Sequence, residues 1–332
     1  MLRLLPVALA LAALFAPACK GDSSELVIYS GRSQALVEPL VDRYAEETGK
    51  KVTVRYGGTS QLAVALMQEG DNSPADVFWG QDAGALGALD AADLLAPLGD
   101  DLARTESAFR GASGTWVATS GRARVFAYSP SRVDEDELPD SVFDLADERW
   151  RGRLGWAPTN GSFQSFVTAM VAAEGEEATR AWLEAVRANG AVSFPNNSSL
   201  LQAIAAGTVD AALTNHYYLH RMKQDDPAFP VAQTSFADGD VGNLVNVAGL
   251  AVLASSSRSD EAEAFIAAML APEAQRFFAE ETFEYPVIPL SGERSEGLVS
   301  PEELERVSPR LELDELADLE TSLELLRDAE LL

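Results

Sequence analysis

Two adjacent tyrosines and both histidines of the 332-residue chain lie in one short segment, the hexapeptide NHYYLH from Asn215 to His220. A phenolate oxygen is a hard ligand, and a hard trivalent cation such as Fe3+ is among the few partners that can displace a phenolic proton near neutral pH. The adjacent pair Tyr217 and Tyr218 therefore favours a ferric site.

The same hexapeptide allows other interpretations. Adjacent side chains point to opposite faces of a strand and diverge by about 100° on a helix, so one tyrosine could belong to the core. Both hydroxyls converge at a bend just after a strand, and Val209 to Asn215 has the pattern of a strand that ends in a polar break. His216 and His220 have the i, i+4 spacing of a zinc-binding helix face, but the Glu of hydrolytic zinc motifs is absent.

Strand and helix patterns alternate along the chain and must position the tyrosines. They follow one another as β-α-β-α-β-α over residues 26–95, and a second, similar series begins near Arg122. Such alternation is typical of a parallel sheet covered by helices on both faces. We therefore predict an α/β protein of two lobes joined by crossing strands, with ligands bound in the cleft beside the carboxyl ends of strands.

The charge of the chain excludes some partners. Its 52 acidic and 25 basic residues give a net charge of -27, which argues against nucleic acid or basic-patch attachment to anionic lipid. Much of the excess solvates the surface, as in residues 309–332, whose pattern predicts an amphipathic helix.

The N-terminal sequence MLRLLPVALALAALFAPACK has the layout of a secretory signal peptide: an early Arg, an apolar run, and small residues before Cys19. We expect residues 1–18 to be removed and residues 19–24 to form a tether, with Cys19 lipidated as in bacterial lipoproteins. The short apolar run is not expected to be a transmembrane helix of the mature protein. Cys19 is the single cysteine, so disulfides within the chain, cysteine nucleophiles and Cys-type zinc sites are excluded.

Four strand-to-helix loops are rich in small hydroxyl or amide residues, namely SGRS (30–33), GGTS (57–60), PTNGS (158–162) and PNNSS (195–199). Helix N-capping explains any one of them. Together with Arg32, Arg122 and Arg124, the four loops favour an anion held by the N–H groups of helix starts. None has P-loop or dinucleotide spacing, which disfavours a nucleotide.

Six segments, in this order, resemble the periplasmic ferric-iron-binding proteins of ABC importers, the bacterial transferrins: LVIYSGRS, SPADVFWGQDAGALGAL, SGRARVFAY, RLGWAPTNGSF, NNSSLLQAIAAGTVDAALTNHYY and GLAVLASS. The resemblance runs from about Glu25 to the C-terminus, and SPADVF with N-x-YY is its most specific combination. It implies a two-lobed type II periplasmic binding protein fold, each lobe a mostly parallel sheet covered by helices, with crossing hinge strands. The lobes would comprise residues 25–122 plus 247–297 and 123–246 plus 298–332.

The resemblance also implies a function. The chain would be a periplasmic or cell-envelope receptor, monomeric and not an enzyme, that binds Fe3+ with a synergistic carbonate or phosphate and delivers it to an ABC permease in the inner membrane. The family's paired tyrosine ligands correspond to Tyr217 and Tyr218. Its anion-binding residues correspond to Asn160, Gly161, Ser162, Arg122, Asn197 and Asn215.

Three further ligand positions of the family are changed. Ser33 stands at a His position, Gln81 at a Glu position and Trp156 at the position of a third Tyr. None of these is a good ferric ligand, and Trp cannot ligate at all. Two phenolates leave a six-coordinate ion about four donors short, so carbonate, bicarbonate or water must supply oxygens, with Asp82 nearby. Ser33, Gln81 and Asp82 are then possible cleft-lining residues, and Trp156 either lines the cleft or packs in the core.

Two other functions stay open at this point. The same fold could bind an organic anion such as a phosphonate or a phosphate ester, with the tyrosines stacking or hydrogen-bonding. An enzyme with His216 or an acidic residue as general base is a third class, but no nucleophile, base and orienting residue can be assembled. Colour distinguishes the ferric receptor from the organic-anion receptor, because iron on paired phenolates gives a coloured protein and an organic anion does not.

Overall fold

The computed structural model describes residues 25–102, 110–290 and 298–332, so the predicted signal peptide and Cys19 lie outside the described residues. The strands found in them are β1 (Glu25–Ser30), β2 (Lys51–Tyr56), β3 (Val77–Gly80), β4 (Trp116–Tyr128), β5 (Leu154–Trp156), β6 (Val192–Ser193), β7 (Ala211–Asn215), β8 (Ala232–Thr234), β9 (Val245–Val252) and β10 (Tyr285–Pro286). They form one sheet system with the order β2-β1-β3-β9-β4-β7-β5-β6, and β8 and β10 also pair with β4.

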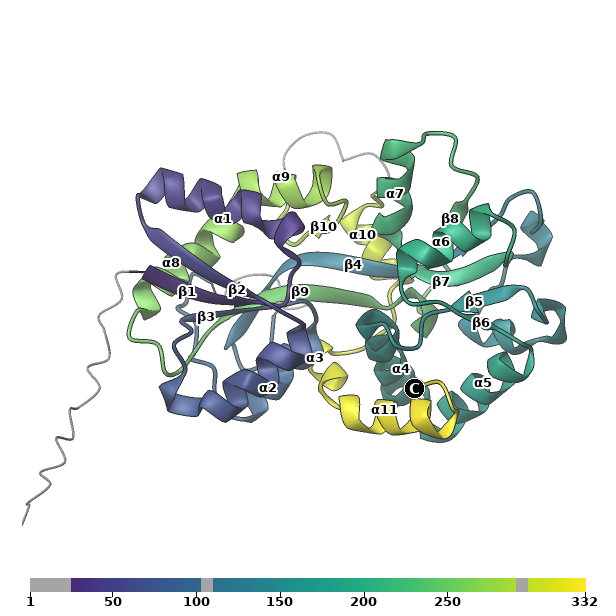
Figure 1. Ribbon diagram of the computed structural model, residues 1–332, viewed down its shortest axis with the longest axis horizontal. Coiled ribbons are helices and arrows are strands. Elements are labelled where there is room, and N and C mark those ends of the chain that lie inside the picture. The colour runs from purple at the N-terminus through teal and green to yellow at the C-terminus, as the bar shows by residue number, and fades with distance from the viewer. Residues whose placement is uncertain (1–24, 103–109, 291–297) are drawn as a thin grey trace, which may run out of the picture.

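Three parallel strands form the centre of the first lobe. β1 lies between β2 and β3, so that Ile28 is beside Val54 and Val77. The surrounding helices are α1 (Gln34–Thr48), α2 (Thr59–Glu69), α3 (Ala83–Ala91), α8 (Ser259–Met269) and α9 (Pro272–Glu280). One face of the sheet buries Leu26 and Ile28 against α1 and α8, and the opposite face packs against α2 and α3 (Figure 1).

The second lobe repeats this arrangement. β5 lies between β7 and β6 and is parallel to both, with Gly155 beside Ala212 and Val192. Its helices are α4 (Gly161–Glu174), α5 (Glu176–Ala188), α6 (Asn197–Ala205) and α7 (His216–Asp225). The α4 and α5 side buries Phe166 and Trp182, whereas α6 packs on the opposite face of the sheet. Short 3-10 turns complete the two lobes: η1 (Gly70–Asn72), η3 (Glu135–Glu137), η4 (Val142–Ala146), η5 (Glu148–Trp150) and η6 (Val241–Asn243).

Two long strands connect the lobes, as the sequence predicted. β4 is 13 residues long and is buried except at its last residue. Its first part pairs with β9 in antiparallel register, which shifts between Ala118 and Ser120, and its last part pairs with β7. Figure 1 shows β4 and β9 running from one group of helices to the other. The two parallel sheets and the crossing strands agree with the predicted architecture.

The C-terminal segment differs from the single amphipathic helix predicted for residues 309–332. It forms a 3-10 turn, η7 (Leu313–Ala317), and then α11 (Leu319–Asp328). Asp318 separates them because its carboxylate accepts a hydrogen bond from the Thr321 N–H at 3.3 Å and caps α11.

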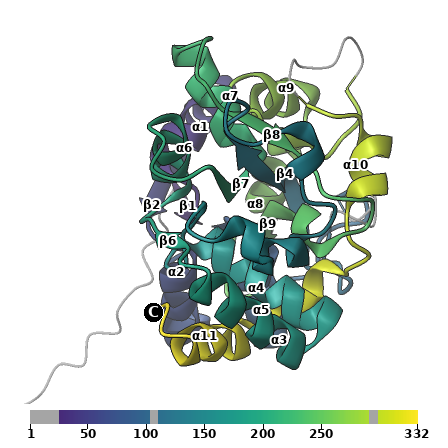
Figure 2. The ribbon, with the colours of Figure 1, turned by 90° about the vertical axis from the view of Figure 1, so that its right-hand side faces the viewer.

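The two C-terminal pieces pack differently: η7 contacts α3 of the first lobe and α4 of the second, whereas α11 packs on the second lobe. η7 packs against α3 so closely that a Cβ on Gly84 would lie 2.4 Å from the Leu316 carbonyl oxygen, and α11 packs beside α4 (Figure 2). A further helix, α10 (Pro301–Val307), precedes them. In the part of the chain that the structure describes, no helix has the length and apolar character needed to cross a bilayer.

Candidate functional site

A cavity of about 410 Å³ lies where loops and helix starts of both lobes meet. The loops after β1 and β2 can approach each other there only because residue 31 is glycine, since a Cβ would lie 2.1 Å from the Thr59 hydroxyl oxygen. Nine of the residues predicted from the sequence line this cavity: Gln81, Asp82, Arg122, Asn160, Gly161, Ser162, Asn215, Tyr217 and Tyr218. The fold therefore gathers residues that are up to about 140 positions apart in the chain.

The tyrosine pair lies at the bend that the sequence predicted. β7 ends at Asn215 and α7 begins at the next residue, so Tyr217 and Tyr218 belong to the first turn of the helix. Their rings are stacked with centroids 4.2 Å apart, and both line the cavity. Burial raises the pKa of Tyr217 above its usual range and Tyr218 raises it further, while Arg122 opposes both effects. Only a strongly attracting cation can therefore displace the Tyr217 proton near neutral pH.

The start of α4 is a second wall of the cavity, held by hydrogen bonds. Asn160 caps the helix, because its Oδ1 accepts from the Ser162 N–H at 3.0 Å and from the Ser162 hydroxyl at 2.6 Å. Asn197 does not line the cavity; its Nδ2 donates to Ser162 Oγ at 3.3 Å, so it acts by positioning Ser162. A helix start of this kind attracts an anion.

Two arginines on β4 supply the positive charge. Arg122 and Arg124 are 4% and 3% exposed, and both line the cavity. Neither forms an ion pair with a carboxylate of the described residues: Arg122 donates to the Gln81 carbonyl oxygen, and Arg124 donates to the Ser162 carbonyl oxygen at 3.1 Å. Burial lowers the pKa of Arg124 to about 9, an effect that Tyr218 opposes. Two buried guanidinium groups without carboxylate partners suit an anionic ligand.

The comparisons with known proteins agree with this geometry. Residues 26–284 match the family model described as bacterial extracellular solute-binding protein. The chain belongs to this family. The Fe(3+)-binding periplasmic protein of Serratia marcescens is 37% identical over 266 residues, which are 79% of this chain and 78% of that protein. The major ferric iron-binding protein of Neisseria meningitidis serogroup B is 37% identical over 274 residues, 80% of this chain and 82% of that protein.

A solved structure gives the fold of this solute-binding protein. Iron-bound HitA from Pseudomonas aeruginosa superposes with a TM-score of 0.85 at 35% identity, covering 92% of this chain and 99% of HitA. This confirms the type II periplasmic binding fold and the resemblance to the ferric-iron-binding group. The protein is a solute-binding protein rather than an enzyme.

Two of the possible cleft-lining residues, Ser33 and Trp156, are not among the residues that line the cavity of this solute-binding protein. Ser33 is exposed at the N-cap of α1, and its side chain does not reach the cavity wall. Trp156 is 3% exposed and packs edge-on against Phe163 with ring centroids 6.0 Å apart, so the packing alternative describes it. Trp156 belongs to the same buried hydrophobic cluster as Phe163 and Phe166.

Asp82 and Gln81 do line the cavity. Asp82 caps α3, with Oδ1 accepting from the Ala85 N–H at 3.0 Å. Burial raises the pKa of Asp82, while the Ala85 hydrogen bond and the charge of Arg122 lower it. Gln81 contributes a neutral amide where the family has a carboxylate ligand.

The sequence prediction includes Arg124 among three arginines that favour an anion, but not among the site residues. Its spacing from Arg122 is the sequence signal that could have placed it in the cavity wall. Arg122 and Arg124 are two positions apart on one strand, so their side chains share a face of β4. Asn246 of β9, which also lines the cavity and accepts from the Ala83 N–H at 3.2 Å, had no comparable sequence signal.

The two histidines do not complete a zinc site. His216 is 1% exposed, accepts a hydrogen bond from the Ala123 N–H at 3.2 Å, and stacks on Tyr285 with centroids 4.4 Å apart. Burial, followed by the nearby His220, lowers the pKa of His216 to about 4, so its ring is neutral near pH 7. Among the described residues, no group of three or more His, Cys, Asp or Glu side chains could hold a metal ion. His216 instead attaches the tyrosine-bearing helix to β4.

Proposed function

We propose that this protein is an extracytoplasmic receptor that binds Fe3+ through Tyr217 and Tyr218 and delivers it to an ABC permease. The observation that carries the proposal is the stacked tyrosine pair at the start of α7, facing a cavity whose other groups attract an anion. The relatives named as Fe(3+)-binding periplasmic protein and major ferric iron-binding protein support it. The limits 25–122 plus 247–297 and 123–246 plus 298–332 are our proposal for the two closing lobes.

A synergistic carbonate or phosphate completes the proposed iron site. The positive charges of Fe3+, Arg122 and Arg124 outnumber the two phenolates, and the phenolates fill only part of a six-coordinate shell. Ser162 and the other residues at the start of α4 would hold the anion, with Arg122 as its charged partner. Asn197 would hold Ser162 in place through its hydrogen bond, and Asn215 would contribute from the end of β7.

Iron retention is expected to depend on this anion. In buffer without bicarbonate and phosphate, retention against a competing chelator should weaken by roughly 10- to 100-fold, because hydrogen bonds to charged groups contribute about 1.5–3 kcal/mol. The visible phenolate-to-iron charge-transfer band measures the bound fraction. Equal retention with and without the anions would contradict the proposed shell, and a colourless protein that binds only organic anions would favour the alternative ligand.

We also propose that residues 1–18 are a signal peptide and that Cys19 carries the lipid of a membrane-anchored protein in the cell envelope. Cys19→Ser should release the protein from membranes or leave it misprocessed, without changing ferric binding, because Cys19 precedes the described lobes. The mass of the mature N-terminus and membrane fractionation measure this. An unmodified mature N-terminus at another residue would show that the proposal is wrong.

A further inference from the structure

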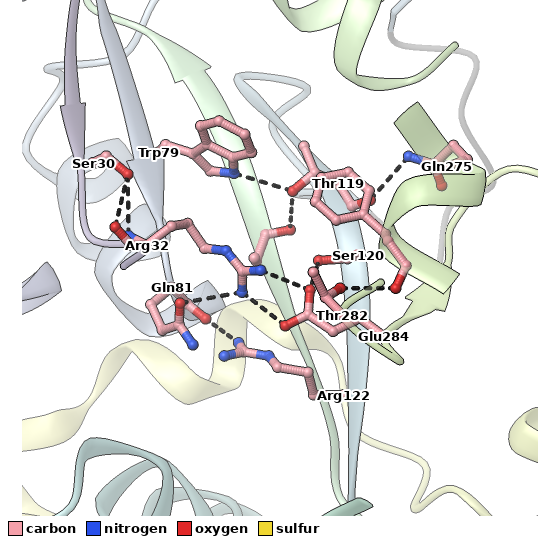
Figure 3. A network of polar contacts seen from close by, with 12 residues as sticks. Ser30, Arg32, Trp79, Gln81, Thr119, Ser120, Arg122, Gln275, Thr282 and Glu284 are labelled. Atoms are coloured by element: carbon pink, nitrogen blue, oxygen red, sulfur yellow. Dashed lines mark hydrogen bonds and ion pairs between the residues drawn. The ribbon is translucent and has the colours of Figure 1, made fainter. Parts of the chain in front are cut away.

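Beside the cavity lies a buried ion pair between residues far apart in the chain (Figure 3). Arg32, just after β1, donates from Nη1 and Nη2 to the two carboxylate oxygens of Glu284 at 2.9 and 2.7 Å. Both residues are 1% exposed, and the Ser120 hydroxyl donates to the same carboxylate at 2.6 Å. Glu284 thus neutralises Arg32 and fixes the orientation of its guanidinium group.

The fixed guanidinium group determines the orientation of the Gln81 amide. Nη1 of Arg32 also donates to Gln81 Oε1 at 3.2 Å. A guanidinium group has only donors, so only the amide oxygen of Gln81 can face it. The amide nitrogen must then point away from Arg32, as it does in Figure 3.

The backbone polar groups of Gln81 are also hydrogen-bonded. Its backbone N–H donates to the Thr59 hydroxyl at 3.3 Å, and its carbonyl oxygen accepts from Arg122. Within the described residues the amide nitrogen makes no hydrogen bond, and Gln81 lines the cavity. The residue therefore offers a donor to the cavity, while its side-chain oxygen accepts from Arg32.

We propose that the Gln81 amide nitrogen binds an oxygen of the anion that accompanies the metal, with Arg32 and Glu284 as its positioning pair. This inference rests on the proposed function. It changes the role of position 81 from a metal ligand to a hydrogen-bond donor to the anion. The lone pair of an amide nitrogen is delocalised into the carbonyl group, so this nitrogen is a poor ligand for iron but a good hydrogen-bond donor to an oxyanion. Gln81 belongs to the first lobe and Ser162 to the second, so an anion between them would contact both lobes.

The test compares two isosteric charge changes at the cavity wall. Gln81→Glu replaces the donor by an acceptor that repels an oxyanion, and Gln61→Glu places the same charge on another cavity-lining residue as a matched control. Titration calorimetry of the metal-free proteins with inorganic phosphate measures the affinity. We expect Gln81→Glu to weaken phosphate binding at least about tenfold more than Gln61→Glu, since a charge-assisted hydrogen bond is lost. Gln81→Met, which removes the donor without adding charge, should weaken it by a smaller factor of about five to ten.

Several outcomes overturn the inference. They are equal losses for the two Glu variants, an unchanged affinity in Gln81→Met, or a parent protein that takes up no phosphate without metal. Circular dichroism and the thermal midpoint of each variant establish that it is folded. The charge-transfer band of the iron-loaded parent tests the proposed function separately. A parent that binds phosphate through Gln81 but no iron would refute the ferric function and leave the inference standing.

Discussion

Replacing either Tyr217 or Tyr218 by Phe should greatly reduce or abolish the visible charge-transfer band and lower ferric affinity by roughly 100-fold or more. Loss of an outer-shell partner already costs about 10–100-fold in metal affinity, and each substitution removes a direct donor. The ring stack at 4.2 Å is retained, so the fold should persist. Titration with a ferric chelate, read by absorbance and by total iron, measures the effect.

A matched control for the tyrosine variants is Tyr44→Phe. The Tyr44 hydroxyl is buried in the core without a hydrogen-bond partner, and Tyr44 does not line the cavity. Its removal should leave iron binding unchanged. If both cavity variants bind Fe3+ as the parent and the control do, the phenolates are not ligands and the ferric function is wrong.

The tyrosine pair also gives the sign of the pH dependence. Because burial raises the pKa of Tyr217, its hydroxyl is protonated near pH 7 and metal binding must release that proton. Protons therefore compete with iron, and affinity should fall steadily as the pH is lowered. The Phe variants, which release fewer protons, should show a shallower dependence of their residual binding. A parent affinity that is independent of pH would contradict phenolate coordination.

Local patterns were sufficient to predict the tyrosine bend and the alternating lobes. A strand followed at once by a polar break fixes where Tyr217 and Tyr218 meet, and this information lies within ten residues of sequence. The orientation of Gln81 has no such local basis. It depends on Glu284, which is 252 positions from Arg32 and stands in no periodic pattern. Sequence reasoning could place Gln81 near the cleft but could not show which end of its amide faces the ligand.

Long-range packing also decides between alternatives that the sequence leaves open. Trp156 could line the cleft or pack in the core, and its contact with Phe163 shows that it packs in the core. The C-terminal helix was predicted as continuous because its apolar period is continuous, whereas the Asp318 cap ends one element and starts the next. Local hydrogen bonds and long-range packing thus decide these two features, whereas hydrophobic periodicity alone predicts the alternating strands and helices correctly.

Glu284→Gln should destabilise the protein by about 3–5 kcal/mol, because it leaves the Arg32 guanidinium buried without its counter-charge. Urea unfolding at pH 7 measures the free energy. The control is Glu148→Gln, which removes an exposed ion pair with Arg151 and should change stability little, since Glu148 is 85% exposed. The double change Arg32→Met with Glu284→Leu should cost less than Glu284→Gln alone, because no unpaired charge remains.

Acid should remove the stability that the Arg32–Glu284 ion pair contributes to the parent protein. Burial alone would raise the pKa of Glu284, but Arg32 and then Arg122 lower it below its usual range. The folded state thus binds this proton less readily than the unfolded state, so the ion pair's stability is present above the ordinary carboxyl pKa. It is lost as the pH falls through the lowered value. Unfolding free energies measured from pH 7 downward should therefore decline more steeply for the parent than for Glu284→Gln. Parallel curves would mean that Glu284 does not hold Arg32 as a charged pair, and the orientation inferred for Gln81 would lose its cause.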